Sequence, residues 1–137
     1  MFNLAGLARH FLKNLFKKAP KKNVPKVPEV KMIDGWLPET AVDTVPEGFG
    51  PMKPTWKGVG HQFPGTKQES VRIDKGNLNN SQEFQQVDHV VINSGGKVIG
   101  RDGKPIKGAI DANEHNSYMA RIPLDERLKW EKWNGPT

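Results

Sequence analysis

A chain of 137 residues with 35% hydrophobic content accommodates one domain with a modest core, plus appendages. It contains no cysteine, which excludes disulfides, thiolate catalysis, zinc ribbons and iron–sulfur ligation. No stretch reaches the roughly 18 apolar residues that a helix needs to span a bilayer.

The net charge of +6 is unevenly distributed along the chain. Residues 1–31 carry eight basic residues and one acidic residue, a net charge of +7, so the remaining 106 residues carry −1. The basicity therefore belongs to the N-terminal segment rather than to the rest of the chain. This division argues against a domain that coats nucleic acid through its overall charge.

Residues 1–18 have the periodicity of a basic amphipathic helix, which Pro20 ends. The apolar face suits contact with a membrane surface through residues 4–18, or contact with a partner. Packing of the same face on the protein's own body is an equally good interpretation, because periodicity does not say what covers a face. The face consists of Leu4, Leu7, Ala8, Phe11, Leu12 and Leu15.

Residues 19–55 are rich in proline, which fixes φ and removes a backbone donor, so we expect an extended linker rather than a helix. Trp36, Leu37 and Phe49 are expected to pin parts of this linker to a surface. Residues 32–50 carry four acidic and no basic residues. The prolines are Pro20, Pro25, Pro28, Pro38, Pro46, Pro51 and Pro54.

Residues 56–137 are predicted to form the folded body and to fold alone. Residues 70–74 (SVRID) alternate in the manner of a strand, and residues 78–86 are a polar segment with Phe84 facing inward. Residues 87–93 (VDHVVIN) are the strongest strand signal, because they are rich in β-branched side chains. A turn at 94–96 then leads into a second strand at 97–100, which predicts a hairpin.

The C-terminal part is predicted to contain a tight turn at 101–104, a loop at 111–116 and a strand at 118–122. Pro123 is expected to begin a helix that runs through Trp133, with Leu124 and Leu128 facing inward. Antiparallel hairpins combined with terminal helices predict an α+β domain with a small antiparallel sheet and flanking helices.

The motifs of most cofactor-dependent and hydrolytic families are absent. The sequence has no P-loop, no H-E-x-x-H motif and no G-x-S-x-G elbow, and its four histidines are too scattered to predict a metal site. No cofactor is therefore expected. The remaining titratable and cationic candidates on strands and loops are His61, Arg72, His89, His115, Tyr118 and Arg121.

These side chain types can cleave RNA without a cofactor. A general base deprotonates the 2′-hydroxyl, an acid protonates the departing 5′-oxygen, and a cation stabilises the phosphorane charge. Histidine suits both proton roles near neutral pH. Arg72 and Arg121, at alternating strand positions, suit bidentate contacts to phosphate.

Each candidate also has a structural interpretation. Both faces of the strand around His89 are largely apolar, so a buried, hydrogen-bonded histidine is equally consistent with its position. His115 lies in a polar loop, where a solvated histidine is the favoured interpretation. A surface salt bridge explains Arg72 equally well, and His61 is expected in a loop.

Three stretches of the body resemble the nuclease-like toxin domains of bacterial polymorphic toxins. They are V-R-I-D-K-G-N, then G-G-K-V-I-G-R-D-G-K-P-I after a glutamine-containing segment and a strand, and finally A-R-I-P-L-D. Such domains form the C-terminal tips of contact-dependent inhibition and Rhs-type effectors. The similarity covers about residues 58–130.

The resemblance implies the compact fold typified by barnase and RelE, with a helix packed on an antiparallel sheet. It also implies a metal-independent ribonuclease with RNA as substrate, a cognate immunity protein, and a secreted effector that acts in the target-cell cytoplasm. Arg72 matches the first motif and would contact phosphate. Related domains often have a histidine where this chain has Arg121, so His89 or His115 would supply the base.

The alternative is a non-enzymatic accessory subunit of a large mitochondrial or ribosomal assembly. A basic helix, a proline-rich extension and a small body suit a chain that becomes ordered against larger neighbours. A third reading, a peripheral membrane protein, uses the N-terminal helix and leaves the body unexplained.

Overall fold

The computed structural model describes residues 30–55 and 60–137, so the predicted helix at 1–18 and the linker residues 19–29 lie outside the described residues. The compact unit runs from Met32 to Thr137. Its elements are β1 (Met32–Ile33), β2 (Leu37–Pro38), α2 (Glu39–Asp43), the 3-10 helix η2 (Glu47–Phe49), β3 (Lys53–Pro54), β4 (Gly60–Phe63), β5 (Ser70–Asp74), α3 (Glu83–Gln86), β6 (His89–Ser94), β7 (Lys97–Ile99), α4 (Glu114–Ala120), β8 (Ile122–Pro123) and α5 (Leu124–Arg127).

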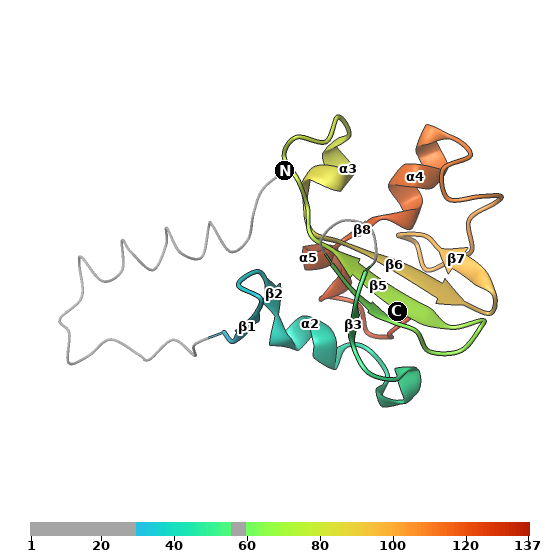
Figure 1. Ribbon diagram of the computed structural model, residues 1–137. Coiled ribbons are helices and arrows are strands. Elements are labelled where there is room, and N and C mark those ends of the chain that lie inside the picture. Colours follow the sequence, from blue (N-terminus) through green and yellow to red (C-terminus); the bar gives the residue numbers. More distant parts are fainter. Residues whose placement is uncertain (1–29, 56–59) are drawn as a thin grey trace. The chain divides into compact units, whose positions relative to one another are not determined.

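The main sheet has six antiparallel strands in the order β3-β4-β5-β6-β7, with β8 paired to β6 beside β7 (Figure 1). A separate two-stranded hairpin, β1–β2, precedes it. Together with the short helices, this arrangement confirms the predicted α+β class. In the part of the chain that the structure describes, no helix is long and apolar enough to cross a membrane.

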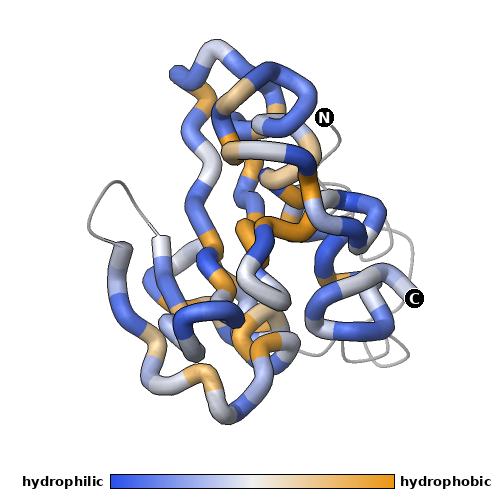
Figure 2. Tube along the Cα trace, turned by 90° about the vertical axis from the view of Figure 1, so that its right-hand side faces the viewer, coloured by the Kyte–Doolittle hydropathy of each residue, from blue (hydrophilic) through white to orange (hydrophobic). Residues whose placement is uncertain are grey.

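The two faces of the sheet differ in polarity because side chains alternate along each strand. Phe63, Val71, Ile73, Val90 and Ile92 all point to one face and are buried. This core face packs against α2 and α5, while α3 and α4 lie on the other side of the sheet (Figure 1). Much of the hydrophobic part of the trace lies in the interior, and the peripheral loops are largely hydrophilic (Figure 2).

The folded body begins at Met32 rather than at residue 56. The segment 32–55, which its prolines had assigned to a linker, contains α2 and contributes Trp36, Leu37, Ala41, Val45 and Phe49 to the core. Proline does not prevent this arrangement, because Pro38 and Pro46 stand at the positions that precede α2 and η2. At the start of a helix the backbone N–H has no acceptor within the helix, so proline removes no helical hydrogen bond there.

The central sheet agrees with the sequence prediction. Strand β5 occupies residues 70–74, and β6 with β7 forms the expected hairpin across the turn at Gly95 and Gly96. Both glycines have positive φ, as this tight turn requires. Phe84 faces inward from α3, and β6 is buried on both faces at residues 89–92.

Two predictions for the C-terminal part were wrong. Residues 114–120 form the helix α4 instead of a loop followed by a strand, and the strand is reduced to β8. The Asn113 side chain caps this helix by accepting from the Asn116 amide at 2.8 Å. The helix from Pro123 ends at Arg127, and Leu128 is exposed rather than inward. Trp133 nevertheless packs on the core, edge-on to Phe49 at 4.9 Å.

Arg127 is buried beneath the C-terminal segment with 2% of its surface exposed. Its Nη2 donates to the Thr44 carbonyl at 3.3 Å, and its guanidinium carbon lies 5.5 Å from the centre of the Trp130 ring. Nε finds no hydrogen-bond partner among the described residues. Burial lowers the pKa of Arg127 to about 10, and the Thr44 contact ties α5 to the segment that follows α2.

Candidate functional site

The second face of the sheet carries polar side chains on β4 and β5, although the buried Val91 of β6 also lies on it. In the pairing register, Gln62 lies beside Arg72 and Gly60 lies beside Asp74. Asp74 in turn lies beside His89 on β6. Because paired residues point to the same face, Arg72, Asp74 and His89 are neighbours by construction of the sheet.

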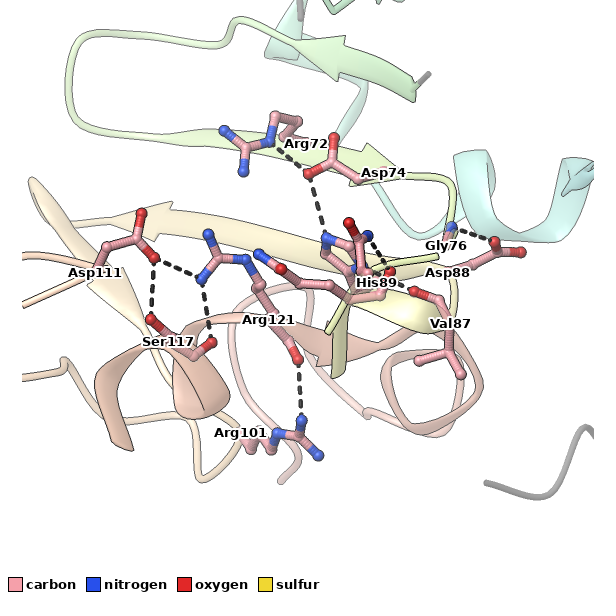
Figure 3. A network of polar contacts seen from close by, with 12 residues as sticks. Arg72, Asp74, Gly76, Val87, Asp88, His89, Arg101, Asp111, Ser117 and Arg121 are labelled. Carbon is pink, nitrogen blue, oxygen red and sulfur yellow. Dashed lines mark hydrogen bonds and ion pairs between the residues drawn. The ribbon is translucent and has the colours of Figure 1, made fainter. Parts of the chain in front are cut away.

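These three side chains form a connected cluster, here called the Arg72–Asp74–His89 cluster (Figure 3). Arg72 Nε donates to Asp74 Oδ2 at 2.9 Å, and His89 Nε2 lies 3.5 Å from the same oxygen. The other imidazole nitrogen, Nδ1, is 2.8 Å from the Val87 carbonyl oxygen. Both ring nitrogens of His89 therefore lie close to an oxygen acceptor.

The three side chains of the cluster differ in solvent exposure, from the buried His89 to the accessible Arg72. The His89 side chain is 7% exposed, Asp74 19% and Arg72 42%. Burial alone would raise the pKa of Asp74, but the hydrogen bond from His89 and the charge of Arg72 outweigh it. The pKa of Asp74 therefore lies below its usual 3.8, and the carboxylate stays ionised beside an accessible guanidinium.

We expect the lowered pKa of Asp74 to make the fold sensitive to acid. A carboxylate whose pKa is depressed by folding contributes stability above its unfolded pKa of about 3.8, and this contribution is lost as the pH falls through the folded value. Asp74→Asn should lower the melting temperature at neutral pH and flatten its decline below about pH 4. Thermal melts of both proteins across this range test the assignment. An unchanged acid decline in Asp74→Asn would contradict it.

Gly60 makes room for the Asp74 carboxylate on the neighbouring strand. A Cβ at Gly60 would lie 2.9 Å from Asp74 Oδ1 and 2.6 Å from the Ile73 carbonyl oxygen. Any larger residue would therefore push the strands apart at the cluster. Glycine is needed here because the two strands approach each other closely. Its backbone conformation does not require glycine, since its φ is not in the left-handed region.

A second charged group adjoins the cluster from α4. Arg121 Nη1 lies 3.0 Å from Asp111 Oδ1 and donates to the Ser117 carbonyl at 3.3 Å. Ser117 Oγ donates to the same Asp111 oxygen at 3.0 Å. These hydrogen bonds, with the charges of Arg121 and Arg72, hold the pKa of Asp111 below its usual value. The two arginines thus act on one carboxylate and bracket one region of the face (Figure 3).

Arg121 reaches this position from a helix end and not from an alternating strand, which corrects the sequence prediction. It is the residue that follows α4, and its side chain folds back over the last turn of that helix. Arg101 holds the same end in place: its Nε donates to the Tyr118 carbonyl at 2.9 Å and its Nη2 to the Arg121 carbonyl at 3.2 Å.

His115 and Tyr118 lie apart from the sheet cluster, three residues apart on α4. Both line an open groove between α3 and α4 with a volume of about 590 Å³. His115 is exposed, as its structural interpretation predicts, although it stands in a helix rather than a loop. Phe84 forms part of the lining and lies 6.1 Å from Tyr118 between ring centres.

His61 belongs to neither group. It stands on β4, not in a loop, and points to the core face opposite Ile73. Its Nε2 lies 3.0 Å from Asp34 Oδ2, and its ring stacks on Trp36 at 5.9 Å. These contacts attach the β1–β2 hairpin to the sheet and leave His61 with a structural role.

Two residues of the site were not predicted from the sequence. Asp74 could have been predicted from the sequence, because strand alternation places Asp74 on the same face as Arg72, two residues earlier. Asp111 depends on the path of a long connection and has no such signal. Among the described residues, no group of three or more His, Cys, Asp or Glu side chains is arranged to hold a metal ion.

Comparisons with known proteins add no assignment. No family model matches the sequence, and searches of curated proteins and of solved structures also find no match.

Proposed function

We propose that this protein is a toxin that cleaves RNA without a metal ion, through the Arg72–Asp74–His89 cluster. The observation that carries the proposal is the direct contact of a guanidinium, a carboxylate and an imidazole on one polar sheet face. These are the groups that RNA cleavage by internal transesterification requires. Arg121, which is buried and paired with Asp111, adds a second positive charge to this region.

In the proposed reaction, the His89–Asp74 pair accepts the proton of the 2′-hydroxyl. The 2′-oxygen then bonds to phosphorus and the bond from phosphorus to the 5′-oxygen breaks. That oxygen leaves with a proton from solvent water, and the protonated His89–Asp74 pair returns its proton to the water. Arg72 has the most accessible side chain of the cluster and neutralises the charge that develops on the phosphorane. Its planar fork suits two phosphate oxygens.

The biological setting of the proposal follows from the resemblance to polymorphic toxin tips. On that basis the protein is a secreted effector that acts in the cytoplasm of a neighbouring cell, and a cognate immunity protein neutralises it. The sheet cluster supports the enzymatic part of this proposal alone. Delivery and immunity rest on the resemblance.

The full chain should therefore degrade RNA in the presence of a chelator and inhibit bacterial growth when expressed under tight induction. The test measures total and transfer RNA after induction, with purified protein assayed in parallel. His89→Gln should slow cleavage by about 10²–10⁴-fold, the usual cost of losing a positioned acid or base.

His115→Gln, in the groove, serves as the matched comparison for the second histidine. A loss in His115→Gln with an active His89→Gln would move the base to α4. If the wild-type chain is harmless and leaves RNA intact, the ribonuclease proposal fails. An accessory subunit of a large assembly would then be the better interpretation.

A further inference from the structure

The groove between α3 and α4 is built from two exposed carboxylates around an aromatic lining. Glu83 and Phe84 contribute from α3, and Glu114, His115 and Tyr118 contribute from α4. Its volume of about 590 Å³ is in the range of small-molecule sites. The proposed chemistry on the sheet face uses neither Glu83 nor Glu114.

The Tyr118 ring is fixed in place yet accessible. The Arg101 guanidinium lies 3.6 Å from its centre, and Phe84 meets it edge-on at 81°. Tyr118 nevertheless remains 45% exposed and lines the groove. Arg101 covers one face of this ring, so a nucleobase would stack on the other face, because every base has a π-face.

The carboxylates decide which end of a nucleotide enters. Ionised carboxylates accept hydrogen bonds and donate none, and they repel phosphate. The phosphate is therefore excluded from the groove, and the ligand must present N–H donors to Glu83 or Glu114. Guanine, adenine and cytosine carry an exocyclic amino group with two N–H bonds, whereas uracil has a carbonyl oxygen in place of the amino group of cytosine and offers one N–H donor, at N3.

The groove also adjoins the cations of the sheet face. The Arg121 guanidinium carbon lies 6.0 Å from the centre of the Phe84 ring. The positive charges of Arg121 and Arg72 both lower the pKa of Asp111. Phe84 thus places the groove lining close to Arg121.

We propose that this groove is a base-binding subsite that takes an amino-bearing nucleobase in preference to uracil. The inference rests on the proposed ribonuclease function and adds the substrate preference of that enzyme. Tyr118 stacks on the base, and Glu83 and Glu114 accept from its amino group.

The test is an NMR titration of the labelled full chain with GMP, AMP, CMP and UMP. Each amino-bearing nucleotide should shift the signals of Tyr118 and His115 and bind at least about tenfold tighter than UMP, the effect of one hydrogen bond to a charged group. Glu83→Gln or Glu114→Gln should remove this discrimination. Glu131→Gln, an exposed acid outside the groove, should leave it unchanged.

Equal affinity for UMP would overturn the proposal, as would inorganic phosphate that reproduces the same shifts. Tighter binding of N-acetyl-lysine amide than of any nucleotide would assign the groove to a basic side chain of a partner protein instead. Binding is measured without cleavage, so the two proposals fail separately. RNA cleavage with no base preference overturns the groove alone, and base binding by a chain that leaves RNA intact overturns the ribonuclease alone.

Discussion

Arg72→Ala is expected to slow RNA cleavage by about 10²–10³-fold, the usual cost of removing a contact that stabilises transition-state charge. Its ion pair with Asp74 is partly exposed, so the loss of stability should stay within about 1 kcal/mol. Arg72→Lys should recover part of the activity, because it restores the charge without the planar fork. Initial rates on a short fluorescent RNA, with melting temperatures of each variant, measure both effects.

Lys97→Ala is the matched control for this experiment. Lys97 is exposed at the start of β7, and its replacement removes the same unit of charge outside the cluster. A rate for Arg72→Ala equal to that of Lys97→Ala would exclude the sheet cluster as the catalytic site. RNA cleavage by the wild-type chain would then have to be explained by a different set of residues.

Removal of residues 1–55 is expected to abolish cooperative folding. The truncated chain would lose Trp36, Leu37 and Phe49 from the core and uncover their partners on the sheet. Each such side chain contributes about 1.5–3 kcal/mol by burial, so together they approach the whole stability of a small domain, about 5–15 kcal/mol. Arg127 would also lose the Thr44 carbonyl that receives its Nη2.

Circular dichroism melts of two fragments test this expectation. The fragment 32–137 should unfold in one cooperative transition, because it contains the whole compact unit. The fragment 56–137 should show none. A cooperative melt of the shorter fragment would mean that residues 32–55 pack on a core that folds without them.

The parts of the fold that could be predicted are those in which a local pattern and the tertiary structure agree. Alternation identified β5, and β-branched residues with a Gly-Gly turn identified the β6–β7 hairpin. In the segment 32–55, prolines suggested a linker, but burial of Trp36 and Leu37 outweighs what a proline-rich composition indicates locally. The aromatic residues there carried the better signal.

The error at α4 has a specific cause. Residues 118–122 have an acceptable strand composition, and the helix depends on a capping asparagine and on inward-facing Asn116, Ser117 and Ala120. Two of these are polar, so no apolar stripe marked the helix. Asn116 satisfies its amide by donating to the carbonyls of Lys107 and Ala109, contacts that exist only once the preceding loop has folded. Sequence patterns do not encode such long connections.

The division of β5 and β6 into a reactive face and an apolar face constrains how the chain can change in length. Insertion of one residue at the start of β5 would turn Arg72 and Asp74 toward the core and turn Val71 and Ile73 away from it. Substitutions can be absorbed one side chain at a time, but a change of length inverts every position beyond it. Insertions and deletions should therefore accumulate between the strands, while the strands change by substitution alone.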